Sequence, residues 1–232
     1  MEDKRLTLTQ HLEELRERII KSVIVIIAFS CLVGAFIDKI FPILVSPVGN
    51  LVFIVPQEAF VARIKIAFFG GLFLAAPFNL YQIWRFVGAG LTQPEQRQVL
   101  LFGPLSFVFF ALGVCFGYFV IVPIGIKFLL GFATDFLSPM ITINSYISFV
   151  GTLVLAFGLI FELPLASLFL TKIGIVTPKF LSSKRKQAVV VIFISAAILT
   201  PPDVITQCLM AVPLLALYEI GILCSKLAYR PR

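Results

Sequence analysis

The sequence predicts an all-α integral membrane protein, and three observations lead to that fold class. The chain has 232 residues, of which 59% are hydrophobic and only 13% charged, and its mean hydropathy is +1.04. A soluble domain of this size has about twice that share of charged residues. Long apolar runs follow one another without the alternation of a membrane β-barrel. We therefore exclude an ordinary soluble enzyme, a disordered chain and a nucleic-acid-binding protein.

Six apolar runs predict six transmembrane helices. A helix needs about 20 apolar residues to cross a bilayer core of about 30 Å, and the runs cover roughly residues 19–37, 66–87, 99–128, 148–171, 188–199 and 204–224. The third run is long, which requires tilt or an extension beyond the bilayer. The fifth is short, about 18 Å at about 1.5 Å per residue. It is joined to the sixth by a tight turn, so we predict a short final hairpin.

The basic residues predict the orientation, because Lys and Arg collect on the cytoplasmic side of a membrane protein. With six spans, 15 of the 19 Lys and Arg residues fall on the side that holds both termini, and the exceptions are Lys39, Arg63, Lys65 and Lys127. Both termini are therefore predicted in the cytoplasm or its organellar equivalent. The formal net charge of +7 reflects this topology and an attraction to anionic lipid.

Three further segments are expected to be ordered within a single domain that covers residues 1–232. Residues 1–18 contain an amphipathic segment with one apolar stripe, formed by Leu8, Leu12, Leu15 and the following Ile19. The outer loops 38–62 and 129–147 hold many apolar residues and several prolines. We predict that these two loops fold as a cap at the outer interface of the membrane.

Enzyme signatures are absent from the sequence. Its single histidine, His11, excludes a two-histidine metal motif, and the chain has neither a nucleophile elbow nor a phosphate-binding loop. The cysteines lie in apolar runs without a CxxC pair, which is typical of small buried hydrophobic residues: Cys31, Cys115, Cys208 and Cys224. We predict no enzymatic activity, no cofactor and no metal site.

Acidic residues on the predicted inner side have ordinary structural explanations. Pairs such as Glu13–Arg16 and Glu14–Arg18 would stabilise the amphipathic segment by a few tenths of a kcal/mol each. Glu95 follows Pro94 just before the third predicted helix, where a carboxylate suits the helix dipole. Composition alone favours these explanations over a binding site.

Glu162 lies near the middle of the fourth predicted helix, where a charge costs about 2.5–3.5 kcal/mol or more. It must therefore face protein or a water-filled cavity. Pro164 frees a backbone carbonyl near Ile160 and predicts a bend there. Two interpretations stay open, a neutral carboxyl bonded between helices and a carboxyl lining a polar cavity used by a substrate. Because no Lys or Arg lies at that depth, we expect water or a polar neighbour to hold it.

Polar residues in the final hairpin are also open to two interpretations. Thr200 and Gln207 can hydrogen-bond a partner helix within the membrane, or they can bond inside the hairpin. Glu219 lies nearer the inner end of the last helix, where Lys226 could reach it, and we interpret that residue as mostly structural.

A series of short segments occurs in order along nearly the whole chain. These segments are H11-L-E-E-L-R-E-R18, P56-Q-E-A-F60, A76-P77, Y81-Q-I-W-R-F86, F161-E-L-P164, G174-I-V-T-P178, L199-T-P-P-D203 and Q207…P213…Y218-E219. Together they resemble TatC, the family of multispanning subunits of the twin-arginine protein translocase. One segment departs from the family pattern, because the family usually has a proline after Phe86, where this chain reads V87-G-A-G-L91.

The resemblance implies six helices in a cupped, concave arrangement with a short final pair. It also implies a Sec-independent translocase subunit that recognises twin-arginine signal peptides of folded precursors. Such a subunit recruits TatA-like and TatB-like single-span proteins into a multimeric complex, with export driven by the proton gradient. The membrane would be the bacterial plasma (inner) membrane, or a thylakoid or other organellar membrane.

The resemblance also implies particular site residues. Signal-peptide contacts fall at Glu14, Arg16, Phe86 and Glu95, the intramembrane groove would include Glu162, and docking of a partner helix is placed at Leu199, Thr200, Gln207 and Met210. The paired carboxylates are chemically reasonable, because two consecutive arginines in an extended peptide point to opposite sides. Arginine also pairs with a carboxylate through two hydrogen bonds, which lysine cannot do.

The competing function is a small-solute or ion transporter that uses Glu162 as a relay. It would not explain two inner carboxylates, and many such transporters carry an internal repeat that this sequence lacks.

Overall fold

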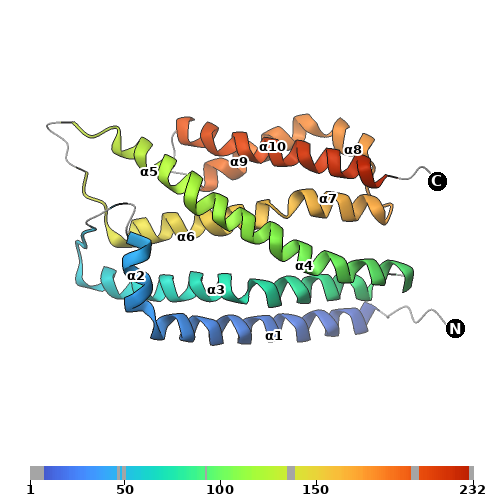
Figure 1. The fold of residues 1–232 in the computed structure, drawn as a ribbon, viewed down its shortest axis with the longest axis horizontal. Coiled ribbons are helices and arrows are strands. Elements are labelled where there is room, and N and C mark those ends of the chain that lie inside the picture. Colours follow the sequence, from blue (N-terminus) through green and yellow to red (C-terminus); the bar gives the residue numbers. More distant parts are fainter. Residues whose placement is uncertain are drawn as a thin grey trace. The chain divides into compact units, whose positions relative to one another are not determined.

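The computed structural model describes residues 8–45, 48, 51–91, 93–134, 139–199 and 204–229 (Figure 1). These residues are helical apart from loops and isolated bridges, among them a parallel bridge between Val52 and Thr142. The chain divides into two compact units. Unit 1 holds Met1–Val108 and Ile141–Ser148, and unit 2 holds Phe109–Met140 and Phe149–Arg232.

Helices make up most of the described part of the chain. In chain order they are α1 (Leu8–Ala35), α2 (Ile37–Val45), α3 (Pro56–Ala89), α4 (Gln93–Phe116), the π-helical η1 (Gly117–Ile121), α5 (Val122–Leu130), α6 (Ile143–Ile160), α7 (Leu163–Lys172), α8 (Pro178–Ser183), α9 (Arg185–Leu199) and α10 (Val204–Ala228).

Five helical stretches in the described part of the chain are long and apolar enough to cross a membrane: Thr9–Ala35, Pro56–Ala89, Leu101–Leu130, Ile143–Lys172 and Val204–Ala228. They coincide with five of the six predicted runs, which confirms the all-α, multi-span class. The predicted fifth run forms α9, whose 15 residues extend about 22 Å at about 1.5 Å each. The count of six spans and the inward orientation of both termini stay predictions.

The last helix is longer than the sequence pattern predicts. α10 has 25 residues and continues to Ala228, so only α9 is a short member of the final hairpin. The helix continues through the charged residues Glu219 and Lys226 of its second half. Glu219 is held there by an ion pair with Arg185 of α9 rather than by the predicted partner Lys226.

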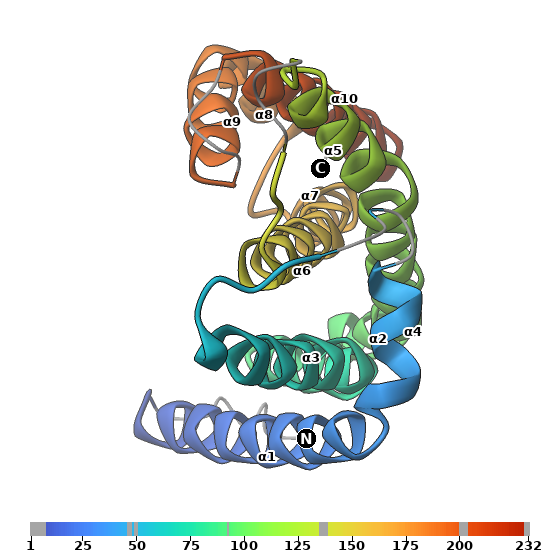
Figure 2. The same cartoon turned by 90° about the vertical axis from the view of Figure 1, so that its left-hand side faces the viewer.

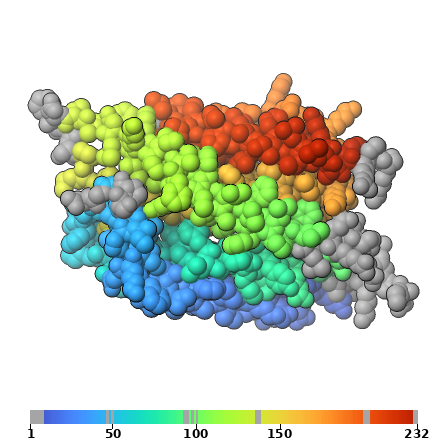
Figure 3. All heavy atoms as spheres, viewed as in Figure 1, coloured from blue at the N-terminus to red at the C-terminus, as the bar shows by residue number. Residues whose placement is uncertain are grey.

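α1 and α3 of unit 1 pack closely side by side (Figure 2). In the space-filling view the side chains of α1, in blue, run alongside those of α3, in teal (Figure 3). Small residues permit this approach, because a Cβ atom added to Gly71 would lie 2.2 Å from Ser30 Oγ and 2.6 Å from Ser30 N. Membrane helices commonly meet through such small residues, which let the two backbones approach.

Residues from both predicted outer loops are hydrogen-bonded to each other in unit 1. Val52 N donates to Ile141 O at 3.1 Å and Ile143 N donates to Val52 O at 2.9 Å. The Tyr146 hydroxyl donates to Leu44 O at 2.7 Å, which ties the start of α6 to α2. These bonds join segments that lie far apart in the sequence. That the two loops form a cap at the membrane surface stays a prediction.

In unit 2, α4 and α6 also approach through a glycine. A Cβ atom on Gly113 would lie 2.4 Å from the carbonyl oxygen of Phe157, whose side chain is fully buried. α7 and α10 are joined by a buried contact of 2.6 Å between the hydroxyls of Thr171 and Ser225. Because Thr171 donates its own proton to Ser167 O at 2.8 Å, Ser225 is the donor of that pair.

Prolines account for two irregularities of the long helices. The predicted bend before Pro164 is present as a break, since α6 ends at Ile160 and α7 begins at Leu163. The π-helical turn η1 immediately precedes the turn that holds Pro123. A proline removes one hydrogen bond from the helical ladder, and a local π turn is a common adjustment.

The cysteines are not buried as the sequence pattern predicts. Cys31, Cys115 and Cys208 are exposed and Cys224 is half-buried. In a membrane protein the outer faces of helices are apolar too, so apolar neighbours in the sequence do not distinguish a lipid-facing cysteine from a core one.

Candidate functional site

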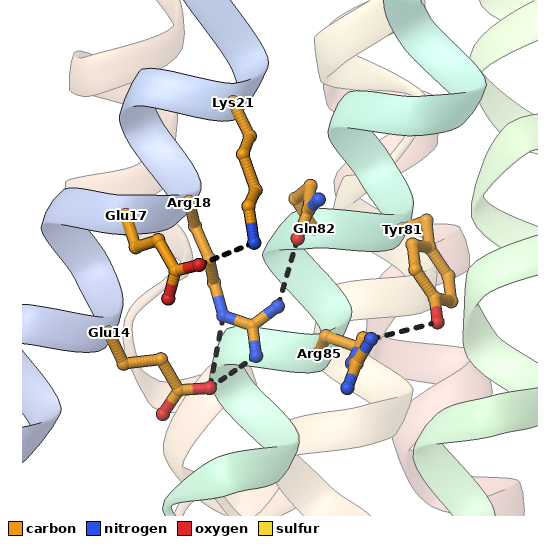
Figure 4. Close-up of polar contacts among 7 residues, drawn as sticks. All are labelled: Glu14, Glu17, Arg18, Lys21, Tyr81, Gln82 and Arg85. Carbon is orange, nitrogen blue, oxygen red and sulfur yellow. Dashed lines mark hydrogen bonds and ion pairs between the residues drawn. The ribbon is translucent and has the colours of Figure 1, made fainter.

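A polar pocket of about 480 Å³ lies between α1 and α3 in unit 1. Its lining residues come from the first turns of α1 and the last turns of α3: Gln10, Glu13, Glu14, Glu17, Arg18, Lys21, Gln82 and Arg85. The pocket therefore carries three carboxylates, three cations and two amides, and Figure 4 shows how most of these side chains lie. A site of this composition suits a charged, hydrogen-bonding ligand.

Arg18 lies at the centre of the contacts in this pocket. Its Nε donates to Glu14 Oε1 at 3.1 Å, and its Nη2 donates to the same oxygen. Its Nη1 donates to Gln82 Oε1 at 2.9 Å, so one guanidinium links α1 to α3 (Figure 4). The side chains of Arg18 and Glu14 are only 14% and 23% exposed. The predicted Glu14–Arg18 pair is thus confirmed, and its partial burial sets it apart from an ordinary surface pair.

The other polar contacts in and beside the pocket are more exposed or longer than those of Arg18. Lys21 and Glu17 pair at 2.5 Å, but their side chains are 53% and 66% exposed, and such exposed pairs contribute little stability. Arg85 Nη1 lies 3.4 Å from the Tyr81 hydroxyl, and its guanidinium lies 5.8 Å from the centre of that ring. The predicted pair of Glu13 with Arg16 is not formed, because Arg16 is exposed and makes no ion pair among the described residues.

His11 and Phe86 form a second link between α1 and α3. Their rings are stacked, with centroids 4.3 Å apart and planes inclined by 17°. Phe86 is half-buried, and the buried His11 Nδ1 has no hydrogen-bond partner among the described residues. The first turns of α1 are therefore held against the end of α3 by an aromatic contact as well as by Arg18.

α4 packs on the same part of α3. The Trp84 and Phe102 rings lie 5.2 Å apart, and Val99 faces Gly88, where an added Cβ would lie 3.4 Å from Val99 Cγ1. Glu95 belongs to the first turn of α4, but its side chain lies outside the described part of the structure. The two predicted carboxylates thus lie on two helices that both pack against the last turns of α3.

Sequence reasoning missed His11, Arg18 and Gln82 as parts of the site. His11, Glu14 and Arg18 have the i, i+3, i+7 spacing of one helix face, and this signal could have grouped them. Gln82 and Phe86 have i, i+4 spacing on α3. No local pattern, however, indicates that these two faces meet.

The predicted docking residues, which belong to unit 2, differ in how far they are buried. Leu199 is half-buried at the end of α9, and Thr200 lies outside the described residues. Gln207 Nε2 donates to Phe193 O at 2.9 Å, which is the bond inside the hairpin that the sequence left open. Met210 is only 2% exposed and is therefore a core residue of this unit, because its side of α10 faces other helices.

Of the remaining acidic residues, Glu162 lies at a helix break and Glu219 lies inside α10. Glu162 is half-buried at the break between α6 and α7. Glu219 forms a two-oxygen ion pair with Arg185, with Nε to Oε1 at 2.7 Å and Nη2 to Oε2 at 2.8 Å. Within the described residues no group of His, Cys, Asp and Glu is arranged to hold a metal ion.

Comparison with known families decides the assignment. The model of the family described as "Sec-independent protein translocase protein (TatC)" matches residues 10–213. The chain belongs to the TatC family. Its relatives include the TatC protein of Carboxydothermus hydrogenoformans, 46% identical over 231 residues that cover 97% of this chain and 95% of the relative. The TatC protein of Aquifex aeolicus is 42% identical over 235 residues, with 97% of each chain covered.

Solved structures of TatC agree with the fold. A crystal structure of the twin arginine translocase receptor TatC superimposes with a TM-score of 0.87 at 41% identity, covering 95% of this chain and all of that one. A second crystal structure of TatC, in DDM, gives a TM-score of 0.86 at 40% identity. The predicted resemblance is therefore confirmed, and with it a role as a non-enzymatic component of the Sec-independent translocase. The bacterial relatives and the five candidate spans make the chain a multi-pass protein of the inner membrane.

Proposed function

We propose that this TatC protein is the subunit that binds twin-arginine signal peptides, with Glu14 and Glu95 as the carboxylates for the two arginines. The observation that carries this proposal is that Glu14, in a polar pocket, already binds a guanidinium, that of Arg18. A carboxylate held in this position is suited to a second arginine from outside. Packing of α1 and α4 on the same turns of α3 supports a shared site for the two carboxylates.

Arg16 and Phe86 would complete the contact with the signal peptide. Arg16 is exposed on α1, two residues after Glu14 and outside the pocket lining, and offers donors to the carbonyl groups of an extended peptide. Phe86 is half-buried and stacked on His11, so it presents an apolar surface held in a fixed place. Together these groups would bind the peptide backbone and its apolar residues beside the two arginines.

Photocrosslinking of a precursor tests this proposal. A folded precursor with a photoreactive residue beside its twin arginines should crosslink to residues of α1 and to the loop before α4 in the assembled complex. A precursor with two lysines is the control, and it should crosslink much more weakly because an ammonium cannot form the two-bond contact. Equal crosslinking of both precursors would contradict recognition by paired carboxylates.

The α9–α10 hairpin is our proposed docking site for TatA-like and TatB-like single-span helices. Its surface at the junction is strongly apolar, since Ile198 is 78% and Val204 73% exposed. Gln207 lies beside this surface and is half-buried, so its amide can also reach a neighbouring helix. The family resemblance also implies Leu199, Thr200 and Met210, of which Met210 is only 2% exposed and is left out of this proposal.

Disulfide crosslinking checks the docking site, after replacement of the four native cysteines. Cysteine at position 198 or 207 should form a disulfide with a cysteine near the outer end of the partner helix. Cysteine at position 210 of the same helix is the matched control, because Met210 is 2% exposed and should not react. Crosslinks found only along α1 would place the partner elsewhere.

Glu162 is proposed to act as a neutral, polar group within the membrane. Glu162→Gln keeps the size and hydrogen-bonding capacity, so transport should be largely preserved, whereas Glu162→Leu should impair transport after precursor binding. The measurement is export of a precursor into inverted membrane vesicles, with precursor binding measured separately. If Gln abolishes transport as completely as Leu, the charge itself is required and the proposal for Glu162 is wrong.

A further inference from the structure

We propose that Arg18 occupies the carboxylate of Glu14 before the signal peptide arrives, so that the precursor binds by exchanging one guanidinium for another. This inference rests on the proposed function, because it takes Glu14 as the group that receives an arginine of the signal peptide. It adds a residue of this chain that competes with the ligand and thereby lowers the apparent affinity of the site.

The geometry of the internal pair favours an exchange. Both contacts of Arg18, from Nε and Nη2, go to the single oxygen Oε1 of Glu14. The ion pair of Arg185 with Glu219 shows the alternative within the same chain, since it uses both carboxylate oxygens, at 2.7 and 2.8 Å. Two parallel bonds to two oxygens are the stronger arrangement for arginine and carboxylate. An incoming arginine, which is not constrained to the same helix, can form this stronger arrangement with Glu14.

Gln82 provides a place for the displaced guanidinium. Arg18 Nη1 already donates to Gln82 Oε1 at 2.9 Å, and Gln82 is buried on α3. After exchange, Arg18 can keep this bond while its other donors turn toward the pocket, where Glu17 lies (Figure 4). The pocket volume of about 480 Å³ is within the usual range of small-ligand sites, about 300–1,000 Å³, and leaves room for a second guanidinium.

The exchange lowers the apparent affinity of the site for every peptide that binds Glu14. A site that is open for only a fraction of the time binds its ligand more weakly by that fraction. Every ligand must displace Arg18, but an arginine regains two charge-assisted bonds whereas a lysine ammonium forms a single point contact. The cost of displacing Arg18 is the same for both peptides, so the Kd of each rises by the same factor, and the preference for arginine comes from the contact with Glu14 itself.

Equilibrium binding of fluorescent peptides to the purified complex in nanodiscs tests this inference. If Glu14 is paired for about nine-tenths of the time, Arg18→Gln should lower the Kd of a twin-arginine peptide about tenfold. The Kd of a twin-lysine peptide should fall by the same factor, so that the ratio of the two constants stays unchanged. Arg18→Lys keeps the charge but loses the planar group that contacts both Glu14 and Gln82, and it should give an intermediate gain of about threefold.

Arg185→Gln is the matched control, since it removes an arginine from another Arg–Glu pair with the same change of net charge. It should leave both constants within about twofold of wild type. The exchange is overturned if both Arg18 variants bind the twin-arginine peptide as weakly as wild type or more weakly. If Glu14→Gln still weakens binding in that case, the proposed receptor function stands. Unchanged binding in Glu14→Gln would instead overturn the proposed receptor function, so the two failures are distinguishable.

Discussion

Replacing Glu14 by Gln should reduce capture of a twin-arginine precursor by about 30-fold, and Glu95→Gln should have an effect of the same order. Loss of one partner of a desolvated charge pair costs about 2–5 kcal/mol. Glu14 is 23% exposed, so the lower end of this range, about 2 kcal/mol, is appropriate. The amide of Gln keeps the size of the side chain, and the change therefore removes the charge without leaving a cavity.

Precursor crosslinking and peptide binding measure this effect in the assembled complex. Glu219→Gln is the control, because Glu219 also binds an arginine but lies on α10 in unit 2, outside the pocket. It should leave precursor capture within about twofold of wild type, since both side chains of its ion pair are 50% exposed. Equal crosslinking in wild type and in both the Glu14 and the Glu95 variants would contradict the assignment of the site.

Gly113→Ala should lower the free energy of unfolding of the protein by about 1–3 kcal/mol or more. A Cβ atom at this position would lie 2.4 Å from the carbonyl oxygen of Phe157 and 2.9 Å from Gly158 Cα. These neighbours are backbone atoms of α6, which cannot turn away as a flexible side chain can. α4 and α6 must therefore separate, and the contacts of the fully buried Phe157 side chain are loosened.

Gly103→Ala is the matched control for this change, because both glycines lie in α4 and no atom of the described residues lies within 4 Å of a Cβ atom on Gly103. It should be neutral or stabilise the helix by at most about 1 kcal/mol, since Ala favours helix more than Gly does. Thermal unfolding in detergent, followed by the fraction of monodisperse protein after heating, measures both variants. The same midpoint for the two variants would show that the α4–α6 contact is not as close as the structure places it.

The contacts that the sequence predicts correctly are local ones. Glu14 and Arg18 are four residues apart, which on any helix places them side by side, and Pro164 interrupts any helix in which it occurs. These features depend on the backbone of a single helix, so local spacing can predict them, although the equally local Glu13–Arg16 pair is not formed among the described residues. The contacts that it does not predict, such as Arg18 with Gln82 and His11 with Phe86, lie between helices.

The sequence by itself determines the membrane class, five of the spanning helices, the break at Pro164 and, through its ordered motifs, membership of the TatC family. The tertiary structure alone decides which helix faces meet. It buries Met210 and exposes Cys208. It also pairs Glu219 with Arg185 and brings Gln82 into hydrogen-bond contact with Arg18. The physical reason is that a membrane helix is apolar toward both lipid and protein. Hydrophobic periodicity, which marks the buried face of a soluble helix, therefore carries little information here.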